Sequence, residues 1–260
     1  MNAKIYYFSG TGNSLQVAKD LAAEIKGSKL RAIRPGVYID PDDEVDCVGF
    51  VYPVYAWGAP GLVVEFIKAF LLKETTYVFA VVTCADSPGG TLLEINKILA
   101  AKGASLSAGF SIKQPSNYIL WGDAEPEDSQ QNKIIQSKDR IKQIAILIKH
   151  KQRHKPETSG YVVNKLGGLV SKLFRKNIWK QAKKFWVDDK CNQCQTCIRI
   201  CPTQNIKMEN EKLSWGNKCE QCLACLQWCP REAIQYGNKT VKRKRYHHPD
   251  ILLEEMLPND

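Results

Sequence analysis

Eight of the ten cysteines lie within 39 residues in the C-terminal part of the chain, and their spacing carries the most specific chemistry in the sequence. They form two runs of C-x2-C-x2-C-x3-C-P separated by 28 residues. This spacing wraps three thiolates round one face of a cubane iron–sulfur cluster and sends the fourth to the neighbouring cluster. The sequence therefore predicts two 4Fe-4S clusters. One would be held by Cys191, Cys194, Cys197 and Cys229, and the other by Cys219, Cys222, Cys225 and Cys201.

Zinc is the alternative ligand for paired C-x2-C units. A zinc site closes with four ligands, however, and needs neither the third cysteine nor the repeated C-x3-C-P ending, so zinc is disfavoured. Each run by itself lacks an apolar core. The roughly 50 residues around the two runs are therefore expected to be held together by what the cysteines bind.

A second candidate site follows the first predicted strand, in the stretch Ser9-Gly10-Thr11-Gly12-Asn13-Ser14. Small residues let the backbone curl round an anion, while successive N–H groups and a helix N-terminus supply partial positive charge. No lysine follows as in a nucleoside-triphosphate loop, so the stretch favours a terminal monophosphate. The alternative is a helix that is merely well capped by Ser9 or Thr11.

These residues are positioned by alternating strands and helices. Runs rich in Val, Ile, Tyr and Phe predict strands at 3–8, 29–33, 45–52, 76–83 and 108–112. Apolar residues at helical spacing predict helices at 14–26, 61–72, 90–102 and 128–150. Such alternation implies right-handed crossovers onto a buried parallel sheet with helices on both faces. The expected fold class is α/β, a doubly wound five-stranded parallel sheet, followed by a small α+β domain round the cysteines.

The N-terminal part resembles flavodoxin, whose phosphate loop has the pattern [ST]-x-T-G-x-[ST]. Two further stretches match its flavin loops at strand ends, where open sheets bind ligands. The resemblance implies an FMN site with Trp57 stacked on the flavin, although Trp57 also suits a core or surface anchor. Pro88-Gly89-Gly90 stands where flavodoxins usually have a tyrosine, so Tyr118 or the cluster domain is expected to cover the outer flavin face. The predicted FMN residues are Ser9, Gly10, Thr11, Gly12, Asn13, Ser14, Pro53, Val54, Tyr55, Ala56, Trp57, Gly58, Cys84, Ala85, Asp86, Gly89, Gly90 and Tyr118.

Residues 186–240 resemble a bacterial two-cluster ferredoxin, with Gln195 and Leu223 at positions where relatives often have glycine. Together the two parts resemble a family of fused flavodoxin–ferredoxin proteins known mainly from anaerobic bacteria, and the tail Arg245-Tyr246-His247-His248-Pro249 is similar to that family's ending. The expected organisation is a flavodoxin-like domain at 1–150, a basic helical connector at 151–187, a ferredoxin domain at 188–240 and a basic tail at 241–260.

The formal charge of +10, from 37 Lys and Arg against 27 Asp and Glu, lies wholly in the second half of the chain. Residues 151–187 hold ten basic residues and one acidic residue, Glu157, with apolar residues at a spacing of three or four. This pattern predicts an amphipathic helix or helix pair, bent at Gly167-Gly168, that packs its apolar stripe on a neighbouring domain. A membrane-surface helix is the less favoured alternative. Binding of nucleic acid through Lys242-Arg243-Lys244-Arg245 is disfavoured because no recognition motif accompanies the charges.

Iron–sulfur clusters pass single electrons and a flavin accepts one or two, so their combination predicts an electron-transfer flavoprotein that interconverts the two. The alternative is an FMN-dependent reductase of a small acceptor, fed by the clusters. Cys47 and Cys84 are expected to be buried and neutral, and the two histidines of the tail to pack rather than to bind metal. No signal peptide is recognised before the first strand, so a cytoplasmic protein with a soluble redox partner is expected.

Overall fold

Five parallel strands form the centre of the N-terminal part of the molecule. The computed structural model describes residues 2–37, 45–70 and 76–258. The strand order is β2-β1-β3-β4-β5, and every neighbouring pair is parallel. This is the flavodoxin-like order of a doubly wound sheet, so the predicted fold is confirmed. The strands are β1 (Ala3–Tyr7), β2 (Lys29–Ala32), β3 (Cys47–Pro53), β4 (Tyr77–Cys84) and β5 (Ala108–Lys113).

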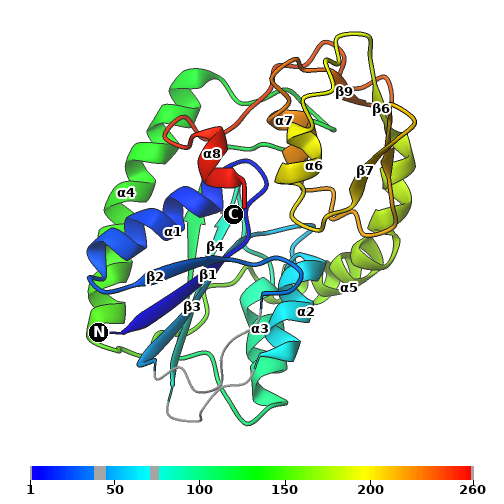
Figure 1. Cartoon of the computed structure of the whole chain (residues 1–260). Coiled ribbons are helices and arrows are strands. Elements are labelled where there is room, and N and C mark those ends of the chain that lie inside the picture. The colour runs from blue at the N-terminus through cyan, green and yellow to red at the C-terminus, as the bar shows by residue number, and fades with distance from the viewer. Residues whose placement is uncertain (1, 38–44, 71–75, 259–260) are drawn as a thin grey trace.

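Helices cover both faces of the sheet, as Figure 1 shows. Alternate strand residues point to opposite faces, so Ile5 packs under α1 and α4 while the next residue, Tyr6, packs under α2 and α3. The four helices are α1 (Asn13–Glu24), α2 (Gly61–Ala69), α3 (Thr91–Ala100) and α4 (Glu127–Lys149). The last two residues of the helix predicted at 61–72 lie outside the described residues.

The cysteine-rich part forms a small unit that lies beside the C-terminal ends of the sheet strands (Figure 1). It contains two antiparallel pairs, β6 with β9 and β7 with β8, and two short helices, each of which carries the third cysteine of a run. Its elements are β6 (Phe185–Val187), α6 (Thr196–Ile200), β7 (Ile206–Glu209), β8 (Lys212–Trp215), α7 (Ala224–Gln227) and β9 (Ile234–Tyr236).

The connector folds as a helix, α5 (Tyr161–Ile178), followed by a 3-10 helix, η1 (Trp179–Lys184). The predicted amphipathic helix is therefore present, and it runs through Gly167 and Gly168 as one element. The prediction that its apolar stripe packs on a neighbouring domain holds only for the end of the connector, where Ile178, Ala182 and Phe185 are buried. Along the earlier turns of α5 the small residues Gly167 and Ser171 face the protein instead, and the larger apolar side chains from Val162 to Leu173 are exposed. No helix in the described part of the chain is long and apolar enough to cross a membrane.

The C-terminal tail returns across the N-terminal part and ends in α8 (Leu253–Met256) beside α1 (Figure 1). The Lys19 ammonium pairs with the Glu255 carboxylate, and the Arg34 guanidinium donates to the carbonyl of Met256 at 2.7 Å. Two arginines of the basic stretch also donate inside the protein. Arg243 donates to the carbonyl of Ile119, and Arg245 donates to that of Ile234 at 3.0 Å. Because these two guanidinium groups form hydrogen bonds within the protein, they are less available to bind phosphates, which weighs against the nucleic-acid alternative.

Both tail histidines pack against the protein, as predicted. His247 stacks on Trp228 with ring centroids 4.3 Å apart. His248 is fully buried, and its backbone N–H donates to the carbonyl of Thr11 at 2.8 Å. Burial lowers the pKa of the His248 imidazole from 6.5 to about 4. The ring therefore stays neutral in the folded protein at pH values where it is protonated in the unfolded chain.

This shift predicts a pH dependence of stability. Between pH 6.5 and pH 4 the unfolded state binds the extra proton, so the free energy of unfolding falls as the pH falls. We expect a loss of about 2 kcal/mol on going from pH 7 to pH 5, and a smaller loss in His248→Asn. Anaerobic denaturant titration at the two pH values measures this difference. An equal loss in both proteins would show that His248 is not the group responsible.

Candidate functional site

The structure brings each predicted set of four cysteines to one cavity. Cys191, Cys194, Cys197 and Cys229 line the first, so the fourth thiol comes from the second run. Cys219, Cys222, Cys225 and Cys201 line the second, where the fourth thiol comes from the first run. The crossed arrangement predicted from the spacing is thus the arrangement in which the chain folds.

The thiols around the two cavities accept hydrogen bonds from the backbone. Backbone N–H groups of Asn205, Gln221 and Ala233 donate to the sulfurs of Cys201, Cys219 and Cys229, each at 3.3 Å. Such donors stabilise thiolates and tune the potential of a cluster bound to them.

Burial makes the free thiols reluctant to ionise. It raises the pKa of Cys197 to about 12 and that of Cys219 to about 11, and neighbouring thiols add to both shifts. Cys194, which is exposed, differs: its desolvation is outweighed by hydrogen bonds at Thr196, which lower its pKa. Thiolates that crowd round one cavity repel one another, so a bound cation favours the ionised set. The donor set therefore fits a cationic metal cluster.

The two residues that replace glycine adopt glycine-like backbone conformations. Gln195 has a φ of 59° and Leu223 a φ of 61°, both in the left-handed region. A side chain costs roughly 1 kcal/mol there, which explains why glycine suits this position. Leu223 is buried in the core of the small unit, so packing offsets the backbone cost. Gln195 is exposed and gains no such compensation.

The two cysteine runs are similar in sequence but have different surroundings. In the second run the Glu220 carboxylate accepts the N–H groups of Gly61 and Leu62, at 2.9 and 2.8 Å, at the N-terminus of α2. Its charge faces the positive end of the helix dipole. The corresponding residue of the first run, Asn192, is exposed. The two copies of the repeat thus have different surroundings, since only the second docks on the flavodoxin-like domain through this position.

Gly10 is a second contact of this docking. A Cβ on Gly10 would lie 2.3 Å from the carbonyl oxygen of Cys222, so the close approach of the two backbones requires glycine here. The indole N–H of Trp228 donates to the carbonyl of Gly10 at 3.1 Å. Tyr55 and Cys222 both pack against the core layer under α2 and α3. The Cys201, Cys219, Cys222 and Cys225 cavity, which we call the inner cavity, is thus the one next to the predicted FMN loops.

The other cavity, which we call the outer cavity, is nearer solvent. Cys194 is exposed, and so are the neighbouring Asn192, Gln193 and Gln195. Asn192, which corresponds to Glu220, faces solvent instead of a helix end. A protein partner would therefore reach the outer cavity more readily than the inner one.

The loop from Ser9 to Ser14 has donors suited to an anion. The Gly12 N–H donates to the Ser9 hydroxyl at 3.1 Å, whereas those of Gly10, Thr11, Asn13 and Ser14 have no acceptor in the described part of the chain. Side chains fix the loop from several directions: Ser14 bonds Thr83 at 2.7 Å, Asn117 donates to Thr11 at 2.5 Å, and Tyr246 donates to Asn13 at 2.6 Å. No side chain caps α1, so the capped-helix alternative does not describe this loop.

Two buried side chains near these loops have polar atoms without a partner. Gln114 follows β5, and its N–H donates to the carbonyl of Cys84 at 2.9 Å. Neither atom of the Gln114 amide, nor Nε2 of His248, has a hydrogen-bond partner among the described residues. Buried groups of this kind are normally satisfied. Their position at the carboxyl ends of the strands fits a polar ligand bound there.

The two predicted flavin loops touch each other. Ala56 and Trp57 form a two-residue turn with φ values of 48° and 62°, closed by hydrogen bonds between Tyr55 and Gly58 at 2.8 and 3.0 Å. Gly89 lies against the backbone of Trp57, where an added Cβ would approach its carbonyl oxygen to 2.6 Å. Within the second loop, Cys84 is buried, and burial raises its pKa to about 11, while Asp86 is exposed.

The remaining predicted positions fall within the same two loops. Pro53 ends β3, and Val54 donates its N–H to the carbonyl of Thr83 at 2.9 Å, which joins the first loop to the end of β4. Ala85 accepts a hydrogen bond from the Lys133 ammonium at 3.5 Å, and Gly90 precedes α3.

Helix α5 covers these loops, and sequence reasoning missed this contact. Trp57 packs on Gly167, where a Cβ would lie 2.8 Å from that of Trp57, and Gly58 packs against Ser171. Arg175 pairs with Glu94 of α3 and donates to the carbonyl of Ala59 at 2.9 Å. The sequence signal was the spacing of four between the small residues Gly167 and Ser171, on the face opposite the apolar stripe.

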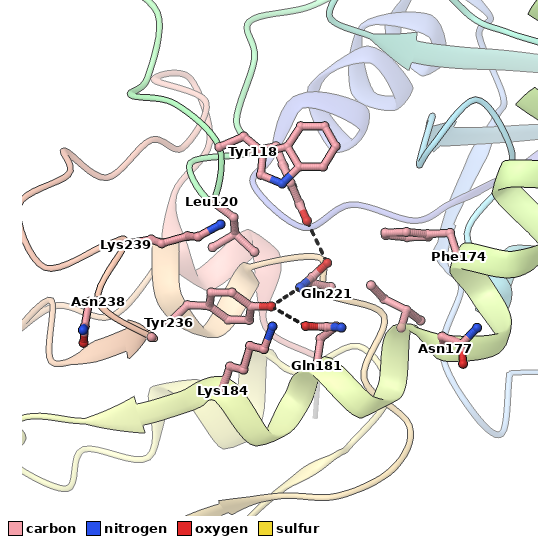
Figure 2. A pocket seen from close by; sticks show the side chains of 13 residues that line it. Tyr118, Leu120, Phe174, Asn177, Gln181, Lys184, Gln221, Tyr236, Asn238 and Lys239 are labelled. Atoms are coloured by element: carbon pink, nitrogen blue, oxygen red, sulfur yellow. Dashed lines mark hydrogen bonds between the residues drawn. The ribbon is translucent and has the colours of Figure 1, made fainter.

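Tyr118 lies at the meeting point of the loop after β5, the connector and the small unit. Figure 2 shows a chain of hydrogen bonds from Tyr118 to Gln221 at 2.8 Å, on to Tyr236 at 3.1 Å and then to Gln181 at 2.9 Å. These residues border a cavity of about 510 Å³. Burial raises the pKa of Tyr118 to about 12, so the phenol is a neutral donor. The cavity is also lined by Leu120, Trp121, Phe174, Asn177, Ile178, Lys184, Gly237, Asn238 and Lys239.

Comparison with known proteins identifies the small unit. Residues 190–239 match the family described as a 4Fe-4S dicluster domain. Comparison with curated proteins gives no match.

Solved structures similar to the N-terminal part include the Fusobacterium nucleatum flavodoxin bound to flavin mononucleotide (15% identity, 58% of this chain, 98% of that one, TM-score 0.42). The Streptococcus pneumoniae TIGR4 flavodoxin is also similar (16% identity, 57% of this chain, 98% of that one, TM-score 0.41). So is the Bacillus anthracis azoreductase (10% identity, 56% of this chain, 99% of that one, TM-score 0.38). The strand order, rather than these likenesses, establishes the fold.

The Glu220 contact predicts an asymmetric response to mutation. Glu220→Ala removes two charge-assisted hydrogen bonds and the favourable interaction with the α2 dipole, so we expect a loss of about 2 kcal/mol in the free energy of unfolding. Asn192→Ala, the same change at the corresponding exposed position, should alter it by less than about 0.5 kcal/mol. Denaturant titration of the iron-loaded proteins measures both. Equal effects of the two changes would show that the second run is not docked through Glu220.

Proposed function

We propose that this chain, a flavodoxin-like domain joined to a 4Fe-4S dicluster domain, is an electron-transfer iron–sulfur flavoprotein with two 4Fe-4S clusters and one FMN. When bound, the clusters supply one-electron steps and the FMN supplies one- or two-electron steps. The observation that carries the proposal is the docking of the second cysteine run against the anion loop, where the backbones of Gly10 and Cys222 meet.

The residues of this chain support the proposal by holding two kinds of site close together. The four thiols of the inner cavity are packed beside Gly10 and Tyr55. The free N–H groups of the anion loop suit the FMN phosphate, and the unpartnered Gln114 amide suits a polar part of the same ligand. The outer cavity, with its exposed Cys194, suits exchange with a soluble redox protein.

The cofactor content tests this proposal. Anaerobically purified protein should contain about eight irons and one FMN per chain. Cys194→Ser and Cys222→Ser should each lower the iron content, since each removes one predicted ligand. Only Cys222→Ser is expected to weaken FMN retention as well, because its backbone contacts Gly10.

Iron, sulfide and released flavin are measured for all three proteins. Zinc in place of iron, or absence of FMN from fully loaded wild-type protein, would contradict the proposal.

The cavity beside Tyr118 favours one second candidate function, an FMN-dependent reductase of a small acceptor. Its volume of about 510 Å³ suits a small molecule. Aromatic walls from Tyr118, Phe174 and Tyr236 and the ammonium groups of Lys184 and Lys239 suit a planar acid (Figure 2). Gln221, which lies between Cys219 and Cys222 in sequence, forms part of the wall, so an acceptor would bind next to the inner cavity.

Binding of cinnamate and of its uncharged amide tests this second function. If the cavity takes planar acids, wild-type protein should bind the acid more tightly. The double change Lys184→Gln and Lys239→Gln should abolish that preference, while Lys180→Gln, outside the cavity, should preserve it. Calorimetric titration measures the six affinities, two ligands for each of three proteins. The reductase candidate is contradicted if the acid and the amide bind equally, or if neither binds at millimolar concentration.

A further inference from the structure

The outward face of α5 is apolar and uncovered. Val162, Leu166, Leu169 and Leu173 are 66%, 61%, 59% and 54% exposed. Their spacing of four, three and four residues places them on one side of the helix, and Val163 and Val170 widen the stripe. At 100° per residue the six side chains span about 120° of the helix surface. A continuous apolar stripe of this size on a folded protein indicates an interaction surface.

The helix cannot turn this face inward without losing contacts that already exist. Its opposite face bears Gly167 and Ser171, which pack on Trp57 and Gly58, and Arg175 is paired with Glu94 of α3. These contacts fix the rotation of α5 about its axis. The apolar stripe is therefore held outward by the fold.

Positive charge runs beside the stripe. Lys165, Lys172 and Lys176 are exposed and lie on one flank of the apolar residues, within about 60° of the stripe. From residue 158 to residue 187 the sequence contains seven basic residues and no acidic residue. The surface that covers this helix must therefore accept both an apolar face and an unbalanced row of lysines.

We propose that α5 is an interfacial helix that lies on the surface of an anionic membrane. The aliphatic stripe would enter the region between headgroups and acyl chains, and the lysines would contact anionic headgroups. A second copy of this chain is a poorer occupant, because pairing two such faces brings lysine rows together without any acidic residue of the helix to balance them. No membrane-spanning segment is required for this attachment.

Binding to lipid vesicles tests the proposal with iron-loaded full-length protein. Sedimentation with vesicles of phosphatidylcholine alone is compared with sedimentation with vesicles containing one third phosphatidylglycerol, at physiological ionic strength. We expect binding to the anionic vesicles at least about tenfold stronger than to the neutral ones, and weaker at high salt.

Variants test the apolar stripe and the lysines separately. Leu166→Gln with Leu169→Gln should reduce binding to anionic vesicles at least about tenfold. The triple change Lys165→Gln, Lys172→Gln and Lys176→Gln should remove the preference for anionic lipid. The control is Ile135→Gln with Ile146→Gln on α4, two residues of similar exposure at 53% and 51%, which should bind as wild type does.

The cluster absorbance of each variant shows that it is folded. The proposal is overturned if wild-type protein does not bind the anionic vesicles, or if the α5 and α4 variants lose binding equally. It is also overturned if sedimentation equilibrium without lipid shows a dimer that Leu166→Gln with Leu169→Gln dissociates, since the stripe would then be covered by a second copy.

Discussion

The structure depends on one contact, the docking of the second cysteine run on the carboxyl edge of the parallel sheet. Two groups of very different chemistry make it: the Glu220 carboxylate at the N-terminus of α2, and the Cys222 carbonyl against Gly10. The Glu220 carboxylate is attracted to the positive end of a helix. Gly10 has no side chain, so the two backbones can approach each other closely. Together they bring the inner cavity to the loops that end β1 and β3.

Docking also explains how a symmetric sequence repeat gives two different environments. The corresponding residues Asn192 and Glu220 differ in charge, and Gln193 is exposed while Gln221 is buried in the chain of hydrogen bonds shown in Figure 2. Differences in solvent exposure and hydrogen bonding are the usual means by which a protein sets cluster potentials apart. The fold therefore provides an inner and an outer position from two nearly identical runs.

Sequence patterns predicted much of this arrangement. The periodicity of apolar residues predicted the sheet, because the residues of one strand, such as Ile5 and Tyr6, alternate between its two apolar faces. This alternation can be seen within a short stretch of sequence. The crossed pairing of the cysteines also followed from spacing.

The orientation of α5 did not follow from periodicity, because both the apolar stripe and the small residues Gly167 and Ser171 offered a face for packing. The fold uses the small one, since Trp57 and Gly58 come too close for larger side chains. The contact of Glu220 with α2 joins residues 158 positions apart, and nothing in either segment alone indicates it.

The most direct test of the docking account is a crystal structure of the anaerobically purified protein with its cofactors bound. The account predicts FMN at the carboxyl edge of the sheet, with its phosphate in the loop from Ser9 to Ser14. It also predicts that the cluster held by Cys201, Cys219, Cys222 and Cys225 is the nearer of the two to the flavin. A flavin bound away from these loops, or closer to the cluster held by Cys191, Cys194, Cys197 and Cys229, would contradict it.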